Sequence, residues 1–391
     1  MTRSDYYFAL PSMRRTSKLV WVIAGLILAA SLVLGPLSLA VIGMGVGDGF
    51  VAGVLMAALP VPFYIAFALW VDRFEPEPPW LLLLVFVWGA AIAVFFSLIV
   101  NSINEGIMTA LIDPASASVL TAVVSAPLIE ELTKGAALLL LFRWKRGHFD
   151  NVTDGIVYAS MVGLGFAMTE NVQYYGAALA TPEGPTGVFI LRGLMSPFSH
   201  PLFTSMTGIG LGMARESRRR FVKWLAPLAG LAAAMGLHAL WNLSASIGLM
   251  FFAAYAFVMI PAFLAVIVIA LFSLRREARV IRTHLETVVA EGVLSAADIH
   301  ILSSVRGRFG ASTRALFTGG FGQWRARRRF HALATELAFH SWAMEREASA
   351  DAQSFHAELR AAVHAARRAL GLPAAIAAPA ERAPLFPPAA P

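Results

Sequence analysis

The chain has 391 residues, of which 58% are hydrophobic and only 14% are charged, whereas about 25% of the residues of a typical soluble domain are charged. This composition excludes an ordinary soluble enzyme and predicts a polytopic membrane protein with a smaller polar region. The chain has no cysteine, which excludes disulfides, thiolate metal ligands and a cysteine nucleophile. We assign its net charge of +7 to membrane topology and expect no nucleic-acid partner, because Lys and Arg concentrate in the cytosolic loops of membrane proteins.

Eight apolar stretches are long enough to cross the hydrocarbon core, which takes about 20 helical residues. We expect the first to be kept as a membrane helix, because it is too long for the apolar region of a cleaved signal peptide. Lys and Arg occur before the first stretch, after the eighth and in alternate loops between, which predicts cytosolic termini. The expected fold is an all-α polytopic membrane bundle of about eight transmembrane helices, over residues 19–42, 50–71, 80–103, 117–142, 153–180, 187–214, 223–247 and 250–274.

An acidic, proline-rich segment, DRFEPEPPW at 72–80, separates the second and third stretches. Its prolines prevent one continuous helix from passing through it. Glu75 and Glu77 come just before the third stretch, where the positive end of the helix dipole favours acids. The segment therefore reads as a stiff cytosolic hinge.

The fourth stretch carries charges near its middle, in SAPLIEELTKG. Such charges cost about 2.5–3.5 kcal/mol each on insertion scales, so they point to a function. Glu130 and Lys134 are four residues apart on one helix face and can form an ion pair. Glu131 points about 100° away and is not expected to share that contact. Pro127 removes a backbone hydrogen bond and can bend the helix.

The next three stretches bring further polar groups to a similar depth. The fifth holds Glu170 and Asn171, the sixth holds His200, and the seventh holds His238 and Asn242, four residues apart. At about 1.5 Å of rise per residue, these groups and the two adjacent glutamates lie within roughly one or two turns of a common level. Any one of them alone fits a packing or ion-pair role. All of these polar groups together can find partners only if the four consecutive helices that carry them face one common interior.

The residues after the eighth stretch form a separate, more polar region at 275–370. Ser295 followed by Asp298 resembles a capping box before a short helix, and apolar residues at helical spacing form two stripes. A basic cluster in this region is interpreted as a solvated helix face, with contact to anionic lipid headgroups as the alternative. The tail, 371–391, is rich in Ala and Pro and is expected to be disordered. The stripes and the cluster are Phe330, Leu333 and Leu337; Phe355, Leu359 and Val363; and Arg325, Arg327, Arg328 and Arg329.

Acids and imidazoles gathered in a low-dielectric cavity can carry out hydrolysis. A carboxylate can take a proton from water, and a His or Asn side chain can orient that water or stabilise an oxyanion. The candidate catalytic residues are Glu130, Glu131, Glu170, His200 and His238, with Lys134, Asn171 and Asn242 in support. The HExxH zinc motif is absent, but a zinc site built from several helices stays open. Its ligands would be Glu131, Glu170, His200 and His238.

Two other functions can use the same residues. A proton- or ion-coupled transporter also needs intramembrane Glu, Lys and His, although the chain shows no repeat-related halves of the kind that many transporters have. A membrane scaffold acting through its cytosolic helices would not need the glutamates at all.

Five segments together resemble the PrsW family of bacterial intramembrane proteases, which is related to the CAAX prenyl proteases. They occur in the family's order on consecutive stretches and cover nearly half of the chain. They are DRFEPEP at 72–78, EELTK at 130–134, FAMTEN at 166–171, SHPLFT around His200 and HALWN at 238–242.

The resemblance implies an intramembrane endopeptidase in the bacterial cell membrane that cleaves membrane-anchored proteins, such as anti-sigma factors. It implies that Glu130 and Glu131 provide the catalytic base and its partner, completed by Glu170, His200 and His238. The family's metallopeptidase label adds zinc as a cofactor that the residues permit. The acidic hinge recurs in the family, which implies that DRFEPEP guides substrate on the cytosolic side. The protease domain would cover 19–274, after a cytosolic N-terminus at 1–18, and the region after 274 lies outside the resemblance.

Overall fold

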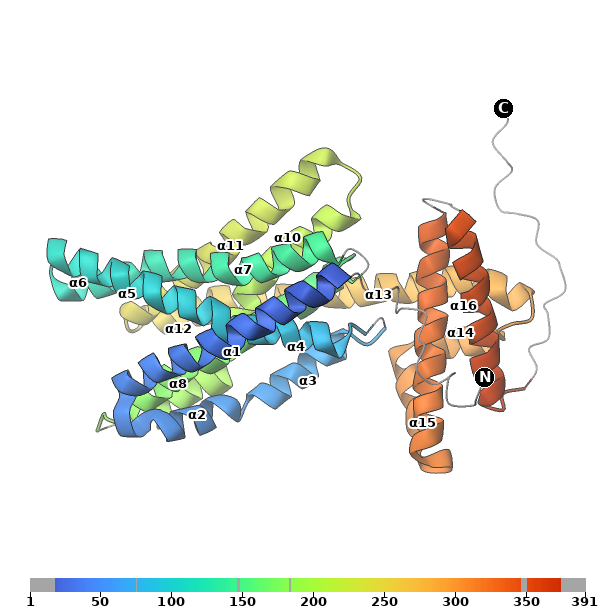
Figure 1. The fold of residues 1–391 in the computed structure, drawn as a ribbon, viewed down its shortest axis with the longest axis horizontal. Helices are drawn as coiled ribbons and strands as arrows, with labels where there is room; N and C mark the ends of the chain where they lie inside the picture. Colours follow the sequence, from blue (N-terminus) through green and yellow to red (C-terminus); the bar gives the residue numbers. More distant parts are fainter. Residues whose placement is uncertain (1–17, 75, 146–147, 183, 346–349, 374–391) are drawn as a thin grey trace. The chain divides into compact units, whose positions relative to one another are not determined.

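The computed structural model describes residues 18–74, 76–145, 148–182, 184–345 and 350–373, which are mainly helical and contain no strand (Figure 1). Most of the predicted N-terminal segment 1–18, the tail beyond 373 and Glu75 of the hinge lie outside the described residues. The chain forms two compact units. The first comprises Thr16–Asp72 and Glu77–Ser273, and the second comprises Arg73–Pro76 and the chain from Leu274 onward.

The first unit is a helical bundle in which several long helices contain short π-helical or 3₁₀ segments. Its elements are α1 Lys18–Val46, η2 Gly47–Gly49, α2 Phe50–Ala58, α3 Val61–Val71, α4 Pro79–Val87, η3 Trp88–Ala93, α5 Val94–Leu111, α6 Pro114–Leu120, η4 Thr121–Ser125, α7 Ala126–Trp144, α8 Val152–Ala178, α9 Thr186–Phe189, η5 Ile190–Met195, α10 Ser199–Glu216, α11 Arg220–Ser246, α12 Met250–Ala254, η6 Tyr255–Met259 and the first part of α13 Ile260–Ala290.

Six helical stretches among the described residues are long and apolar enough to cross a membrane, which confirms an all-α polytopic membrane bundle. The first and longest of them contains both the first and the second expected span. These two spans are separate helices, because the chain turns at Gly47, whose φ of +55° favours glycine. The other five stretches begin near residues 79, 114, 152, 220 and 250, close to the starts of five further expected spans.

The sixth expected span, 187–214, is not one helix and is not among the six stretches. A π-helical segment, η5, ends at Met195, and α10 begins at Ser199. Pro197 explains the break, because a proline disfavours helical backbone in the residue before it. Ser196 has left the helical conformation, with φ −129° and ψ 33°. The expectation of a continuous helix here was therefore wrong, and the break lies next to His200.

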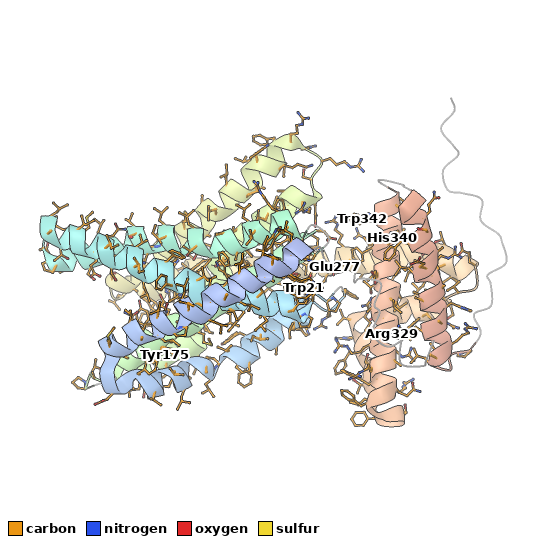
Figure 2. The ribbon with its side chains drawn as sticks, in the orientation of Figure 1. Trp21, Tyr175, Glu277, Arg329, His340 and Trp342 are labelled. Atoms are coloured by element: carbon orange, nitrogen blue, oxygen red, sulfur yellow. The ribbon has the colours of Figure 1, made fainter. Side chains whose placement is uncertain are left out.

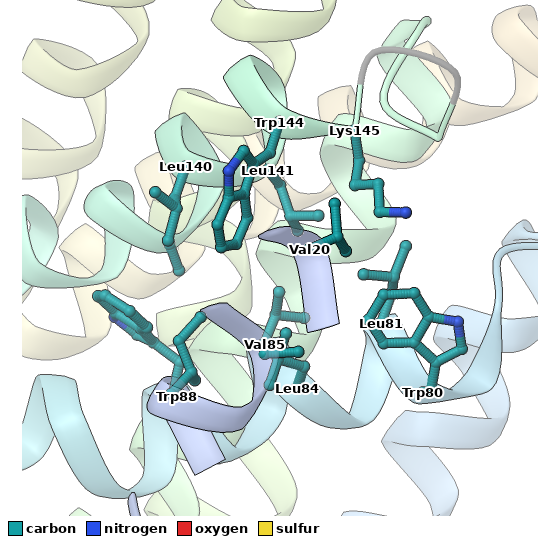
Figure 3. Close-up of a pocket in the computed structure, with 13 residues that line it drawn as sticks. Val20, Trp80, Leu81, Leu84, Val85, Trp88, Leu140, Leu141, Trp144 and Lys145 are labelled. Atoms are coloured by element: carbon teal, nitrogen blue, oxygen red, sulfur yellow. The ribbon is translucent and has the colours of Figure 1, made fainter. Parts of the chain in front are cut away.

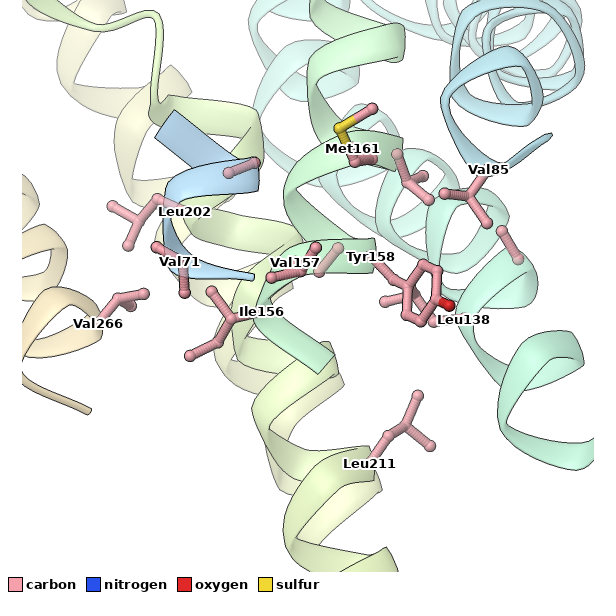
Figure 4. Packing of buried hydrophobic residues seen from close by; sticks show 14 of the residues in the cluster. Val71, Val85, Leu138, Ile156, Val157, Tyr158, Met161, Leu202, Leu211 and Val266 are labelled. Atoms are coloured by element: carbon pink, nitrogen blue, oxygen red, sulfur yellow. The ribbon is translucent and has the colours of Figure 1, made fainter. Parts of the chain in front are cut away.

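Helix α8 is the centre of the bundle. In its most apolar 18-residue window, 83% of the residues are buried, against 17–44% in the other five stretches. The helix starts with a capping box between Asn151 and Asp154. Ile156, Val157 and Tyr158 join the largest hydrophobic cluster, together with residues of α4, α7 and α10 (Figure 4). Helices α7 and α10 pack against this one helix, and α11 packs against α7 and α10.

Glycines bring the backbones of α8 and α10 into direct contact. A Cβ atom at Gly155 would lie 2.2 Å from the carbonyl oxygen of Gly208, and one at Gly163 would lie 2.7 Å from the backbone of His200. Small residues at such crossings allow membrane helices to pack closely. The position of His200 next to α8 is therefore set by the missing side chain of Gly163.

An apolar groove lies between α1, α4 and α7 (Figure 3). Three tryptophans line it, namely Trp80, Trp88 and Trp144, and Lys145 stands at its edge, 5.3 Å from the ring centre of Trp80. The indole nitrogen of Trp88 donates a hydrogen bond of 3.0 Å to the carbonyl of Thr133. The groove wall is thereby fixed to the part of α7 that carries the glutamates.

The second unit consists of the end of α13 and three helices, α14 Ala296–Leu302, α15 Val305–Met344 and α16 Ala350–Ala369. The predicted capping box of Ser295 and Asp298 is confirmed. Both apolar stripes face the core of this unit, with Phe330, Leu333 and Leu337 from α15 and Leu359 and Val363 from α16 buried. His340, near the end of α15, packs against Phe355 of α16, with ring centres 5.0 Å apart (Figure 2).

We predict that Gly155→Ala lowers the thermal unfolding temperature of the purified protein. The new methyl group would meet the backbone of Gly208, and overpacking of this kind costs about 1–3 kcal/mol. Gly236→Ala in α11 is the matched control, because no atom lies within 4 Å of the Cβ position there. Equal unfolding temperatures for the two variants would contradict the close packing of α8 and α10.

Candidate active site

The ammonium group of Lys134 is the centre of the polar cluster. Its Nζ atom lies 3.2 Å from Glu130 Oε2, 2.9 Å from Glu131 Oε1 and 3.0 Å from His200 Nδ1. It also lies 3.8 Å from the ring centre of Phe166 on α8, a distance at which a cation is attracted to an aromatic face. Lys134 is completely buried. One cation thus joins side chains of α7, α8 and α10.

The two adjacent glutamates differ in how completely they are bonded. Glu131 is fully buried and accepts hydrogen bonds from Lys134, from Thr204 Oγ1 at 3.0 Å and from His238 Nδ1 at 3.1 Å. Glu130 receives its hydrogen bond from Lys134, and its side chain keeps 7% of its surface exposed. The expectation that Glu131 does not share the lysine was wrong, because residues three apart are also neighbours on a helix surface.

His200 connects the lysine to a second acid. Lys134 can only donate to Nδ1, so the proton of the imidazole is on Nε2, which donates to Glu170 Oε2 at 3.0 Å. Glu170 also forms an ion pair with Arg192 of η5. Arg192 in turn donates to Asn171 Oδ1 at 2.6 Å. The FAMTEN segment is therefore held by the short π-helical segment just before the break at Pro197.

His238 stands between the two glutamates. Its Nδ1 donates to Glu131, which leaves Nε2 as an acceptor. Nε2 lies 3.9 Å from Glu130 Oε2, which is too far for a direct hydrogen bond and short enough for one water molecule to contact both atoms. The imidazole stacks on Phe203, with ring centres 4.9 Å apart. His238 is thus fixed in orientation by one acid and one aromatic ring.

Asn242 of α11 bonds to the backbone of η4, the π-helical segment that precedes α7. The amide of Ala126 donates to the carbonyl of Thr121, five residues back, in π-helical geometry. The next carbonyl, of Ala122, would be the partner of residue 127, but Pro127 has no N–H. Asn242 Nδ2 donates to this carbonyl at 2.8 Å. Its amide therefore compensates for a proline in the helix that carries the glutamates.

Glu77 of the acidic hinge is buried and bonded within the first unit. Tyr158 of α8 donates to its Oε2 at 2.5 Å, and its backbone amide donates to Asp72 at 2.7 Å. Burial, and then the nearby carboxylates of Asp72 and Asp150, raise the pKa of Glu77 well above its usual range, against the opposing effect of the Tyr158 hydrogen bond. These contacts indicate an anchoring role for Glu77, in contrast to the exposed position that a guide for substrate would need.

The structure brings the predicted residues of four helices together and adds two that the sequence analysis missed. The missed residues are Arg192, which pairs with Glu170, and Thr204, which bonds to Glu131. Arg192 had a recognisable signal, since it is a single charge in the apolar run TGVFILRGLM and such charges are rarely without a role. Thr204 had none, because a threonine four residues after His200 is unremarkable in sequence.

Ligand atoms of Glu130, His200 and His238 lie within 4.8 Å of one another, a spacing that a metal ion could bridge. His200 and His238 were predicted as zinc ligands, whereas Glu130 was not. The other two predicted ligands, Glu131 and Glu170, form ion pairs with Lys134 and Arg192, respectively, and Lys134 also pairs with Glu130. Two imidazoles and one carboxylate are donors that suit zinc.

The position of Lys134 does not fit a bound metal ion. Its ammonium already contacts Glu130 Oε2 and His200 Nδ1, two of the three residues of this group. A divalent cation bound to these atoms would have to displace a buried ammonium that also neutralises Glu131. The residues present therefore do not fit a metal ion at this position.

The fold and the site together define the class of the protein. It is a polytopic helical membrane protein in which carboxylates and imidazoles meet around one buried lysine. Comparison with known proteins agrees with this class. The model of the family described as PrsW family intramembrane metalloprotease matches residues 77–269, which include every candidate residue. The chain belongs to the PrsW family, and membership supports a proteolytic function.

Several relatives carry the name Protease PrsW. The chain is 32% identical to that of Geobacillus kaustophilus over 157 residues, which are 39% of this chain and 63% of the relative. It is 30% identical to that of Oceanobacillus iheyensis over 200 residues, 51% of this chain and 84% of the relative. It is 29% identical to that of Bacillus subtilis over 190 residues, 48% of this chain and 74% of the relative. No solved structure matches the chain.

We predict that the cost of Asn242→Ala depends on Pro127. Alone, the substitution leaves the Ala122 carbonyl without its donor and should destabilise the protein by about 1–3 kcal/mol. In a Pro127→Ala background, the new amide at 127 can bond this carbonyl, so the loss should be smaller. Thermal unfolding of the four proteins of this double-mutant cycle measures the coupling. Equal losses of stability in both backgrounds would contradict the coupling between Asn242 and Pro127. Loss of activity without loss of stability would instead assign Asn242 to the catalytic reaction.

Proposed function

We propose that the protein is an intramembrane endopeptidase that hydrolyses peptide bonds of membrane-anchored proteins, with Glu130 as the base that activates water. Family membership supports the reaction class. The observation that carries the assignment of the base is the unequal bonding of the two glutamates. Glu131 uses both of its oxygens on three donors, whereas Glu130 has one donor and some exposed surface.

Water would be held between Glu130 Oε2 and His238 Nε2, the two acceptors 3.9 Å apart. It donates one hydrogen bond to each, which leaves an oxygen lone pair for the scissile carbonyl carbon. As the C–O bond forms, the water proton passes to Glu130, and a tetrahedral intermediate results. Glu130 then returns the proton to the amide nitrogen as the C–N bond breaks. The buried charge of Lys134 stabilises the negative charge that develops on the intermediate.

The remaining residues position this pair. Glu131 holds His238 through Nδ1, so that Nε2 stays an acceptor directed at Glu130. His200 links Lys134 to Glu170, and Arg192 balances the charge of Glu170. The site lies on helices within the expected membrane spans, which supports a substrate that is itself held in the membrane. We place the protein in the bacterial cell membrane with both termini cytosolic, in accord with the distribution of Lys and Arg.

We predict that Glu130→Gln removes proteolysis, by a factor of at least about 100 if the glutamate acts as general base, and leaves the unfolding temperature near that of the wild type. Glu131→Gln should reduce both activity and stability, because three donors lose a charged acceptor. Glu105→Gln, at an exposed glutamate of α5, is the matched control. Proteomics of membranes from cells with each variant would identify a protein that is truncated only when the enzyme is active.

Cleavage at the wild-type rate by Glu130→Gln would rule out this glutamate as the base. Ion flux into proteoliposomes that is lost in Glu170→Gln, with no truncated membrane protein in any strain, would favour a transporter over a protease.

A further inference from the structure

Helix α15 is a helical hairpin with its turn at Gly320. Its backbone leaves the helical conformation only there, with φ 68° and ψ −167°, a region that favours glycine. Arg308 before the turn donates to Thr335 Oγ1 after it, at 2.5 Å. Arg308 also donates to the carbonyl of Leu302 at 2.6 Å. The two arms therefore run side by side in opposite directions, and the segment around Gly320 is the tip.

The tip carries large exposed aromatic side chains. Phe317 and Phe321 on either side of the turn are 82% and 61% exposed, and Phe309 on the first arm is 72% exposed. None of them belongs to the hydrophobic core of the second unit. Phe321 packs on Trp324, with ring centres 4.9 Å apart. Exposed aromatic residues gathered at one place mark an interaction site.

The hairpin is also strongly basic. No Asp or Glu occurs between Asp298 and Glu336, whereas seven arginines do. Arg325 lies over the ring of Phe321 at 5.6 Å, and Arg328 lies over that of Trp324 at 5.2 Å, so charge and aromatic surface occupy the same place. The exposed arginines are Arg306, Arg314, Arg325 and Arg328.

A buried histidine on the second arm, eleven residues after the turn, lies close to several of these arginines. Burial lowers the pKa of His331 to about 3, and the charges of Arg308, Arg327 and Arg328 contribute to the shift. An anionic surface is therefore the complement of this hairpin. Aromatic and basic residues on one helical element are the features of a protein surface that lies in the interface of an anionic bilayer.

We propose that the tip of the α15 hairpin docks on an anionic lipid bilayer, with Phe317 and Phe321 entering the headgroup region and the exposed arginines contacting lipid phosphates. Helix α13 begins within the eighth expected span and ends in this unit, so the chain tethers the hairpin to a membrane-spanning segment. The bilayer is favoured over a protein partner because the aromatic residues are surrounded by one sign of charge only. The inference does not depend on the proteolytic reaction.

A single labelled cysteine can test the proposal, because the chain has no cysteine of its own. Thr318→Cys at the tip would carry an environment-sensitive fluorophore, in the full chain reconstituted into nanodiscs of phosphatidylcholine with or without phosphatidylglycerol. We expect a blue shift and protection from acrylamide quenching when phosphatidylglycerol is present. A label at Ala365→Cys, on an exposed position of α16, is the matched control and should not respond.

Two variants separate the contribution of the arginine charges from that of the aromatic side chains. Arg314→Gln/Arg325→Gln/Arg328→Gln should remove the dependence on phosphatidylglycerol, and Phe317→Ser/Phe321→Ser should remove the blue shift, each with an unfolding temperature near that of the parent. Equal quenching with and without anionic lipid would overturn the proposal. Protection that follows the number of chains per nanodisc, whatever the lipid, would also overturn it and would assign the tip to contact with a second copy.

Discussion

The bundle depends on one buried ammonium. Lys134 has no contact with solvent, and the cost of burying it is offset only because acids and an imidazole surround it. Those partners come from different helices, so α7 and α10 must meet at one level, with α8 beside them through Phe166 and α11 through His238. The glycine contacts between α8 and α10 serve the same arrangement, since they let the backbones approach closely enough for His200 to reach the lysine.

Irregular helix geometry accompanies this centre. The π-helical segment before Pro127 leaves a carbonyl free that Asn242 of α11 bonds, which joins two site-bearing helices through the backbone. The break at Pro197 places Arg192 on one side and His200 on the other, and both reach Glu170. Unpaired backbone groups are costly in a membrane protein. At these two interruptions a side chain bonds the backbone, Asn242 at the Ala122 carbonyl and Tyr255 at the Met195 carbonyl.

The sequence predicted the features that have a local or compositional cause. Apolar length predicted the spans, the cost of intramembrane charge singled out Glu130, Glu170 and His238, and the local spacing of Ser295 and Asp298 predicted a helix start. The pairing within the site could not be predicted, because it depends on how helices cross. The contacts of Thr204 with Glu131 and of His200 with Lys134 are tertiary contacts between helices. The sharing of Lys134 by both acids lies within α7, and the sequence analysis missed it because it considered only the pair four residues apart. The hairpin turn at Gly320 was missed although the sequence carried a signal for it, because a Gly-Gly pair is typical of turns.

The charge of Lys134 neutralises the acids around it. The most direct test is the thermal unfolding of Lys134→Met, alone and combined with Glu131→Gln. Removal of one partner of a buried ion pair costs about 3–5 kcal/mol, so the single variant should unfold at a clearly lower temperature, and loss of the Glu131 charge should recover much of the difference. A Lys134→Met protein as stable as the wild type would contradict the account and would mean that another cation neutralises the site.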